Sequence, residues 1–135
     1  MKTLQSLAPW IVFAGYAAAA AALSWQSTTI SLETHPVGKA VSFAAFFGFL
    51  LYTVYCSIRE NFFSSLGKLM KLHWGRQVGL DLYVGLLLHA TLLYAMGVTG
   101  WMFFFWAAGF LVFGNTTTLL YLALHFDAIS LVFAP

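Results

Sequence analysis

Charged side chains are scarce in this sequence. Aspartate, glutamate, lysine and arginine together make up 7% of the 135 residues, whereas 61% of the residues are hydrophobic. An ordinary soluble domain has about 25% charged residues, so this composition excludes a water-soluble globular protein. The net charge of +2 is also too small for a nucleic-acid-binding protein, which needs a strong basic excess.

Cysteine and catalytic motifs are rare or missing as well. Cys56 is the single cysteine, which excludes an internal disulfide and a cysteine-rich metal cluster. The sequence contains no Gly-x-Ser-x-Gly nucleophile elbow, no His-Glu-x-x-His zinc motif, no phosphate-binding loop and no clustered carboxylates. We therefore predict a protein that is not an enzyme and that holds no metal.

Long apolar runs are what the sequence has instead. Runs of about twenty apolar residues can cross a hydrocarbon core of ~30 Å, because a helix rises about 1.5 Å per residue. We predict an all-α fold, a single membrane domain in which four transmembrane helices form a bundle. The predicted spans are Pro9 to Trp25, Val41 to Ile58, Val78 to Met96 and Trp101 to Leu124.

The segment between the second and third runs predicts a short amphipathic helix over residues 61 to 74. Its apolar residues recur every three to four positions, and its polar residues occupy another face. Such a helix fits the membrane interface, where Lys68 and Lys71 would reach lipid headgroups.

Basic residues set the expected orientation. Lys2 and the segment between the second and third runs carry the basic residues of one side, whereas the polar loop over residues 26 to 40 carries Lys39 alone. The positive-inside rule then places both termini in the cytoplasm, and we expect a bacterial inner membrane. Trp10 and Trp25 flank the first run at interfacial positions, which favours a retained helix over a cleaved signal peptide.

Asp81 is the one acidic residue inside a long apolar run. A charge at the bilayer centre costs about 2.5 to 3.5 kcal/mol on insertion scales, so an acid there normally has a partner or a wet site. The short connection GVTG predicts that the third and fourth runs form an antiparallel helical hairpin. In this hairpin Asp81 lies about 7 Å in from Arg76, and Thr118 lies about 10 Å in from His125. The predicted polar site consists of Arg76, Asp81, Tyr83, Asn115 and Thr118, with a close helix contact at Gly85 and Gly114 beside it.

Three interpretations of this site stay open. In a structural one, Asp81 pairs with Arg76, caps its helix, or accepts hydrogen bonds from Asn115 or Thr118, and so fixes the hairpin. In a functional one, the same groups line a pocket on the cytoplasmic side that binds a headgroup, an ion or a metabolite. A proton relay from Asp81 toward His89 is the third, although no other span offers a continuation.

His89 lies near the middle of the third run. An intramembrane histidine can ligate haem or a chlorophyll-type magnesium through one ring nitrogen, and the alternative is a histidine hydrogen-bonded across helices. His35, His73 and His125 are all expected near water, so bis-histidine haem is unsupported. We therefore predict no cofactor and keep haem or a pigment at His89 as an alternative.

Two blocks carry a family resemblance: WGRQVGLDLYVGLLL over residues 74 to 88, and WAAGFLVFGNTTTLLYL over residues 106 to 122. They resemble an uncharacterised family of small integral-membrane proteins, in which Trp-Gly-Arg leads into Asp-Leu-Tyr-x-Gly and a later Trp precedes Gly-Asn, a threonine and a tyrosine. The resemblance implies an integral membrane protein and assigns no activity. The matching residues are Trp74, Gly75, Arg76, Asp81, Tyr83, Gly85, Trp106, Gly114, Asn115, Thr118 and Tyr121.

The function that these observations favour is that of a non-catalytic structural or accessory membrane subunit. Its partners would be membrane lipids, other membrane subunits or further copies of itself. The alternatives are a small-molecule or ion carrier that uses Asp81, and a haem or pigment protein that uses His89.

Overall fold

The computed structural model describes residues 2–27 and 35–132, and within these ranges the chain is helical apart from short connections. The predicted all-α class is therefore confirmed. The tip of the predicted loop over residues 26 to 40 lies outside the described residues. The helices are α1 (Lys2–Ser27), α2 (Pro36–Arg59), α3 (Phe62–Leu69), α4 (His73–Ala95), α5 (Gly100–Phe113) and α6 (Asn115–Val132).

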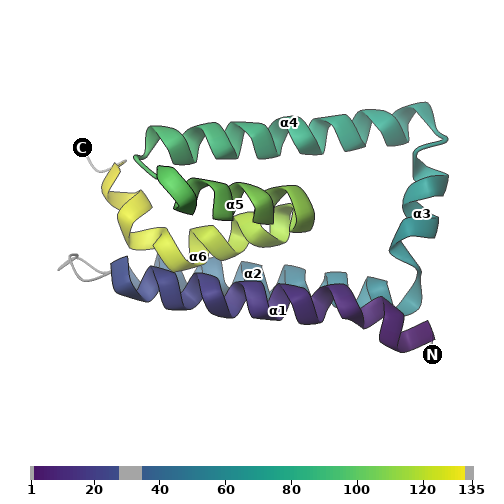
Figure 1. Cartoon of the computed structure of the whole chain (residues 1–135), viewed down its shortest axis with the longest axis horizontal. Helices are drawn as coiled ribbons and strands as arrows, with labels where there is room; N and C mark the ends of the chain where they lie inside the picture. Colours follow the sequence, from purple (N-terminus) through teal and green to yellow (C-terminus); the bar gives the residue numbers. More distant parts are fainter. Residues whose placement is uncertain (1, 28–34, 133–135) are drawn as a thin grey trace.

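The long helices share one direction, and α3 lies across it at one end of the molecule (Figure 1). α4 forms one edge, α1 and α2 form the opposite edge, and α5 and α6 lie between them (Figure 1). α6 packs mainly against α2, whereas α4 packs against α5. The central helices therefore connect two edges that would otherwise be separate.

Short sequence signals begin and end α2 and α3. Pro36 occupies the first turn of α2, where its missing N–H is not needed by the helix. The side chain of Asn61 accepts a hydrogen bond from the backbone N–H of Ser64 at 3.1 Å and so caps the start of α3. The amphipathic helix predicted over residues 61 to 74 is thus a shorter helix, and α4 begins before that range ends.

The chain reverses direction at Gly114. This residue has φ 56° and ψ −134°, a combination that side chains with a Cβ rarely adopt, and it separates α5 from α6. The predicted fourth span, Trp101 to Leu124, is therefore wrong as a single helix: it is two helices that run back along each other (Figure 1). A long apolar run concealed a turn that Gly114 makes possible.

The extra reversal changes where the chain ends. The start of α1 and the end of α6 lie at opposite ends of the long axis (Figure 1). The prediction that both termini share one side depended on four complete passes of the chain. That both termini lie in the cytoplasm therefore stays a prediction.

Two described helices are long and apolar enough to cross a membrane by length and composition, namely α2 and α4. The part of α1 from Ala8 to Ser24 and the whole of α5 are shorter apolar helices. At about 1.5 Å per residue, the 26 residues of α1 extend over roughly 39 Å. The length of α1 therefore matches that of the two longer candidates.

The core lies where α1, α2, α5 and α6 meet, and α4 adds Leu86 and Leu93 to it. Trp106 of α5 is the largest of its fully buried side chains, and its ring contacts the ring of Tyr121 edge-on at 4.8 Å. Aromatic pairs of this geometry add to the free energy of burial itself. The buried apolar residues are Phe13, Ala20, Phe46, Leu86, Leu93, Trp106, Phe110, Leu120 and Tyr121.

The closest approach within this core is made at Gly109. A Cβ at this position would overlap the hydroxyl and ring of Tyr16 and would lie 2.8 Å from the methyl group of Thr117. The Thr117 hydroxyl donates a hydrogen bond to the Gly109 carbonyl at 3.0 Å. By contrast, a Cβ at Gly85 or Gly114 would meet nothing within 4 Å. Among the described residues, no close helix contact is therefore formed at those two glycines.

Candidate functional site

Asp81 lies exposed on α4, and the part of the chain that the structure describes gives it no hydrogen bond or ion pair. Arg76 turns to another residue: its guanidinium donates to Nδ1 of His73 at 2.7 Å. The predicted pairing of Asp81 with Arg76 is therefore not formed.

The other members of the predicted site lie apart from Asp81. Asn115 is exposed at the start of α6, beside the reversal, and Tyr83 is exposed on α4. The Thr118 hydroxyl is buried and has no hydrogen-bond partner among the described residues. Because α4 packs on α5 and α6 packs mainly on α2, the structure does not bring the two halves of the predicted site together.

His89 is exposed on α4, and its Nδ1 donates to the Gly85 carbonyl one turn earlier at 2.8 Å. This bond orients the ring and leaves Nε2 directed away from its own helix backbone. Within the described ranges, no group of three or more His, Cys, Asp or Glu side chains could hold a metal ion. Lys68 and Lys71, the predicted headgroup contacts, are exposed on α3 and on the turn after it.

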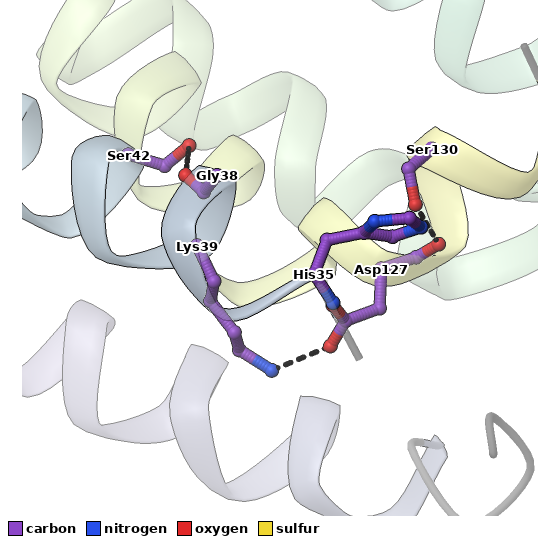
Figure 2. Close-up of polar contacts among 6 residues, drawn as sticks. All are labelled: His35, Gly38, Lys39, Ser42, Asp127 and Ser130. Atoms are coloured by element: carbon purple, nitrogen blue, oxygen red, sulfur yellow. Dashed lines mark hydrogen bonds and ion pairs between the residues drawn. The ribbon is translucent and has the colours of Figure 1, made fainter. Parts of the chain in front are cut away.

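A polar cluster lies instead where α2 begins and α6 ends, and the sequence analysis did not identify it. Lys39 Nζ donates to one carboxylate oxygen of Asp127 at 2.7 Å, and the backbone N–H of His35 donates to the other at 3.2 Å (Figure 2). Asp127 is only 5% exposed. The carboxylate therefore joins two segments that are far apart in the sequence, and we call Lys39, His35 and Asp127 the α2–α6 clamp.

Two features of the surroundings let this clamp form. The Gly38 position lies against the ring of Phe126, and a Cβ there would overlap that ring. The Ser130 hydroxyl donates to the Asp127 carbonyl at 2.7 Å within α6 (Figure 2). The close approach at Gly38 brings the start of α2 near enough for Lys39 to reach across.

The contacts of the clamp determine the charge state of the Asp127 carboxyl. This group lies beside His35, the residue that precedes α2. The hydrogen bond from Lys39 lowers the pKa of this carboxyl below its ordinary value, and the backbone N–H of His35 lowers it further. Both donors favour the ionised form, and their effect exceeds the cost of burial. The Asp127 carboxyl is therefore ionised at neutral pH.

A second group of side chains lies beside the clamp on α6. The ring of His125 stacks on Tyr121 at 4.2 Å and meets Trp106 edge-on at 5.6 Å. Its Nδ1 donates to the Tyr121 carbonyl at 3.1 Å, so in the neutral ring Nε2 accepts from the Ser24 hydroxyl at 3.3 Å. His125 was expected near water but is half-buried, and it connects the end of α1 to α6. The helical backbone departs from regular dihedral angles at this residue, with φ −113° and ψ 18°.

Two hollows in the surface are lined neither by the residues of the clamp nor by His125. An apolar groove of about 460 Å³ lies between α1, α2 and α6, lined by alanines of α1 and phenylalanines of α2. A shallow hollow of about 380 Å³ lies at His73, Trp74 and Gln77. Asp81 lines neither of them.

Comparisons with known proteins add no relative. No family model, no curated protein and no solved structure matches this chain.

Proposed function

We propose that this chain is an integral membrane protein in which α1, α2 and α4 cross the bilayer. The hairpin of α5 and α6 enters from one side and returns to it. The support is the length and apolar composition of these helices and the reversal at Gly114. Helices with internally satisfied backbones are the form in which a chain can cross hydrocarbon.

The charge distribution supports one orientation of this arrangement. Arg59, Lys68, Lys71 and Arg76 lie at the end of the molecule that carries α3, where α1 also begins (Figure 1). At the other end Lys39 is neutralised by Asp127. Under the positive-inside rule the α3 end faces the cytoplasm. The orientation of α3 across the long axis suits a helix at the interface, with its lysines near lipid headgroups.

We further propose that the protein acts as a non-catalytic accessory subunit of a membrane assembly. The exposure of α4 is the observation that carries this proposal. α4 packs on the rest of the protein mainly through α5, and its large apolar side chains Trp74, Leu87 and Leu88 are 79%, 67% and 65% exposed. A helix held along one face offers the remaining surface to lipid or to another helix.

The experiment is native purification. The tagged chain is solubilised from its own membrane in mild detergent, and its mass is measured by native mass spectrometry together with the identity of whatever accompanies it. We expect a complex that is larger than one 14.9 kDa chain and that contains another membrane protein. A monodisperse single chain that carries only lipid at several detergent strengths would contradict the accessory role.

The alternative of a carrier built on Asp81 lacks a comparable observation. A carrier needs its charged group inside a cavity reachable from both sides, and Asp81 lies on an exposed face of one helix. We therefore propose the accessory role alone.

A further inference from the structure

α4 turns one face toward the rest of the protein and the opposite face outward. Gly75, Leu86 and Leu93 are its buried residues, and they recur at helical spacing. Asp81 is exposed and lies about 120° around the helix from these buried residues, at 3.6 residues per turn. Its neighbours at three- and four-residue spacing form a continuous line that we call the outward stripe. The stripe consists of Trp74, Val78, Asp81, Gly85, Leu88 and Leu92.

A carboxylate in the middle of such a stripe is unfavourable in lipid. Asp81 lies eight residues after His73, which places it roughly 12 Å along the axis of α4 from its start. Val78 and Leu88, two other residues of the stripe, are 60% and 65% exposed and offer no donor. Acidic side chains at such depth in a membrane helix normally pair with another group. The described residues supply no such group, which leaves the Asp81 carboxylate open to a partner on another molecule.

We propose that the outward stripe is the docking surface for a membrane helix of a second protein, and that this helix carries a lysine or arginine that pairs with Asp81. The inference rests on the proposed accessory function and names the surface and the chemistry of the partner. Charge complementarity favours a basic residue, because an ionised carboxylate in low dielectric is best compensated by a cation that donates hydrogen bonds to it.

Gly85 gives the stripe room for this contact. It lies one turn from Asp81 on the same face, and a Cβ built there would meet nothing within 4 Å. Small residues at helix interfaces in membranes let two backbones approach closely, which brings side chains on the two helices within hydrogen-bond reach. The space beside Gly85 that the described residues leave open is thus well placed for a contact with another helix.

Two other occupants fit less well. A second copy related by a two-fold axis along the membrane normal would bring Asp81 close to its own counterpart, and two carboxylates at one site repel each other. The nearest basic residue of the chain, Arg76, lies on the surface side of Asp81 and is bonded to His73. Acyl chains offer no donor at all.

The test is photo-crosslinking in the native membrane. A benzophenone amino acid replaces Leu88, which lies in the outward stripe, and in a matched control it replaces Leu87, which is equally exposed on another face at 67% against 65%. We expect a discrete protein adduct from position 88 and little from position 87. Sequencing of the adduct is expected to find a membrane helix with a lysine or arginine.

The same crosslink is then measured in Asp81→Leu, Asp81→Asn and Asp81→Glu. Truncating one member of a desolvated charge pair weakens an interface by more than tenfold, so Asp81→Leu and Asp81→Asn should lower the adduct at least tenfold, whereas Asp81→Glu should retain most of it. Replacing the basic residue of the partner should give the same loss. The melting temperature of the isolated Asp81→Leu and Asp81→Asn proteins should be unchanged, because Asp81 has no partner within the described chain.

Four results would overturn the inference. They are an adduct of twice the mass of the chain, an adduct with lipid only, equal adducts from positions 87 and 88, and an adduct that does not respond to Asp81→Leu and Asp81→Asn. If the chain still migrates in a larger complex in any of these cases, the accessory function survives and only the docking surface is lost. If the chain migrates alone, without any other protein, the accessory function itself is contradicted.

Discussion

The Lys39 ammonium lies 2.7 Å from the Asp127 carboxylate, across a separation of 88 positions in the sequence. This ion pair joins the first turns of α2 to the final turns of α6, and α2 with α6 forms the most extensive helix contact of the described chain. The ion pair of the clamp can therefore form only when α6 is packed against α2.

We predict that Asp127→Asn lowers the stability of the purified protein by about 1 to 3 kcal/mol, because it removes a charged acceptor that two donors share. The melting temperature in detergent measures the effect. Lys71→Met serves as the control, since Lys71 is exposed and should tolerate the change. Equal melting temperatures for Asp127→Asn and the wild type would show that the clamp contributes nothing.

The lowered pKa of Asp127 determines how the stability of the protein depends on pH. Its pKa is lowered in the folded protein from an ordinary value of 3.8, so the stabilisation is fully present above that value and is lost as pH falls through the lower folded pKa. The difference in melting temperature between the wild type and Asp127→Asn should therefore be constant near neutral pH and shrink below pH 3.8. A difference that grows with acidification would contradict this assignment.

Gly109→Ala should destabilise the core by about 1 to 3 kcal/mol, because the added methyl group overlaps Tyr16 and the methyl group of Thr117. The control is Gly48→Ala, where a Cβ would meet nothing within 4 Å and alanine favours the helix. Melting temperatures of the two variants should move in opposite directions. If Gly109→Ala melts at or above the wild-type temperature, α1 and α5 are not as close as described.

The topology gives a prediction about the two ends of the chain. With three crossings and a hairpin that returns, a reporter fused before α1 should read as cytoplasmic and one fused after residue 135 should read as outside. Paired phosphatase and fluorescent-protein fusions at each end measure this, with a fusion in the turn after α3 as the cytoplasmic reference. A cytoplasmic reading at both ends would contradict this topology and would favour a chain that crosses the membrane four times.

The sequence predicted the helical class and the approximate extent of the longer helices, because those depend on local hydrophobicity. α4 begins five residues before the predicted Val78 and ends one residue before the predicted Met96. The short α3 was also anticipated from its periodicity, although its predicted range was too long. Hydrophobicity patterns predicted a helix well where the local composition of the sequence sets the ends of that helix.

The reversal at Gly114 could not be predicted from hydrophobicity, because apolar residues continue on both sides of it. The signal that was available is the order of residues: a glycine that can take positive φ, followed by Asn115 and a threonine run suited to a helix start. Thr117 N–H bonds to the Gly114 carbonyl at 3.1 Å, as such a start requires. Asn115 and Thr118, which were predicted to lie beside Asp81, belong to the first turns of α6 after this reversal.

The clamp was missed because of this error in topology. With four passes, Lys39 and Asp127 belong to opposite sides of the membrane and cannot meet. Once the chain reverses at Gly114, the same two residues fall at one level. Asp81 is the converse case, because the structure leaves it exposed on α4, apart from Asn115 and Thr118 on α6.

The position of the hairpin at the end of the chain has a consequence for biosynthesis. α1 and α2 leave the ribosome long before α6, yet α2 makes its main contact with α6. Under the proposed topology, α2 therefore enters the membrane without its main helix contact, which forms only when the last segment of the chain arrives. We expect a chain cut short after Gly114 to insert its crossings and then to be an unfinished substrate for membrane proteases.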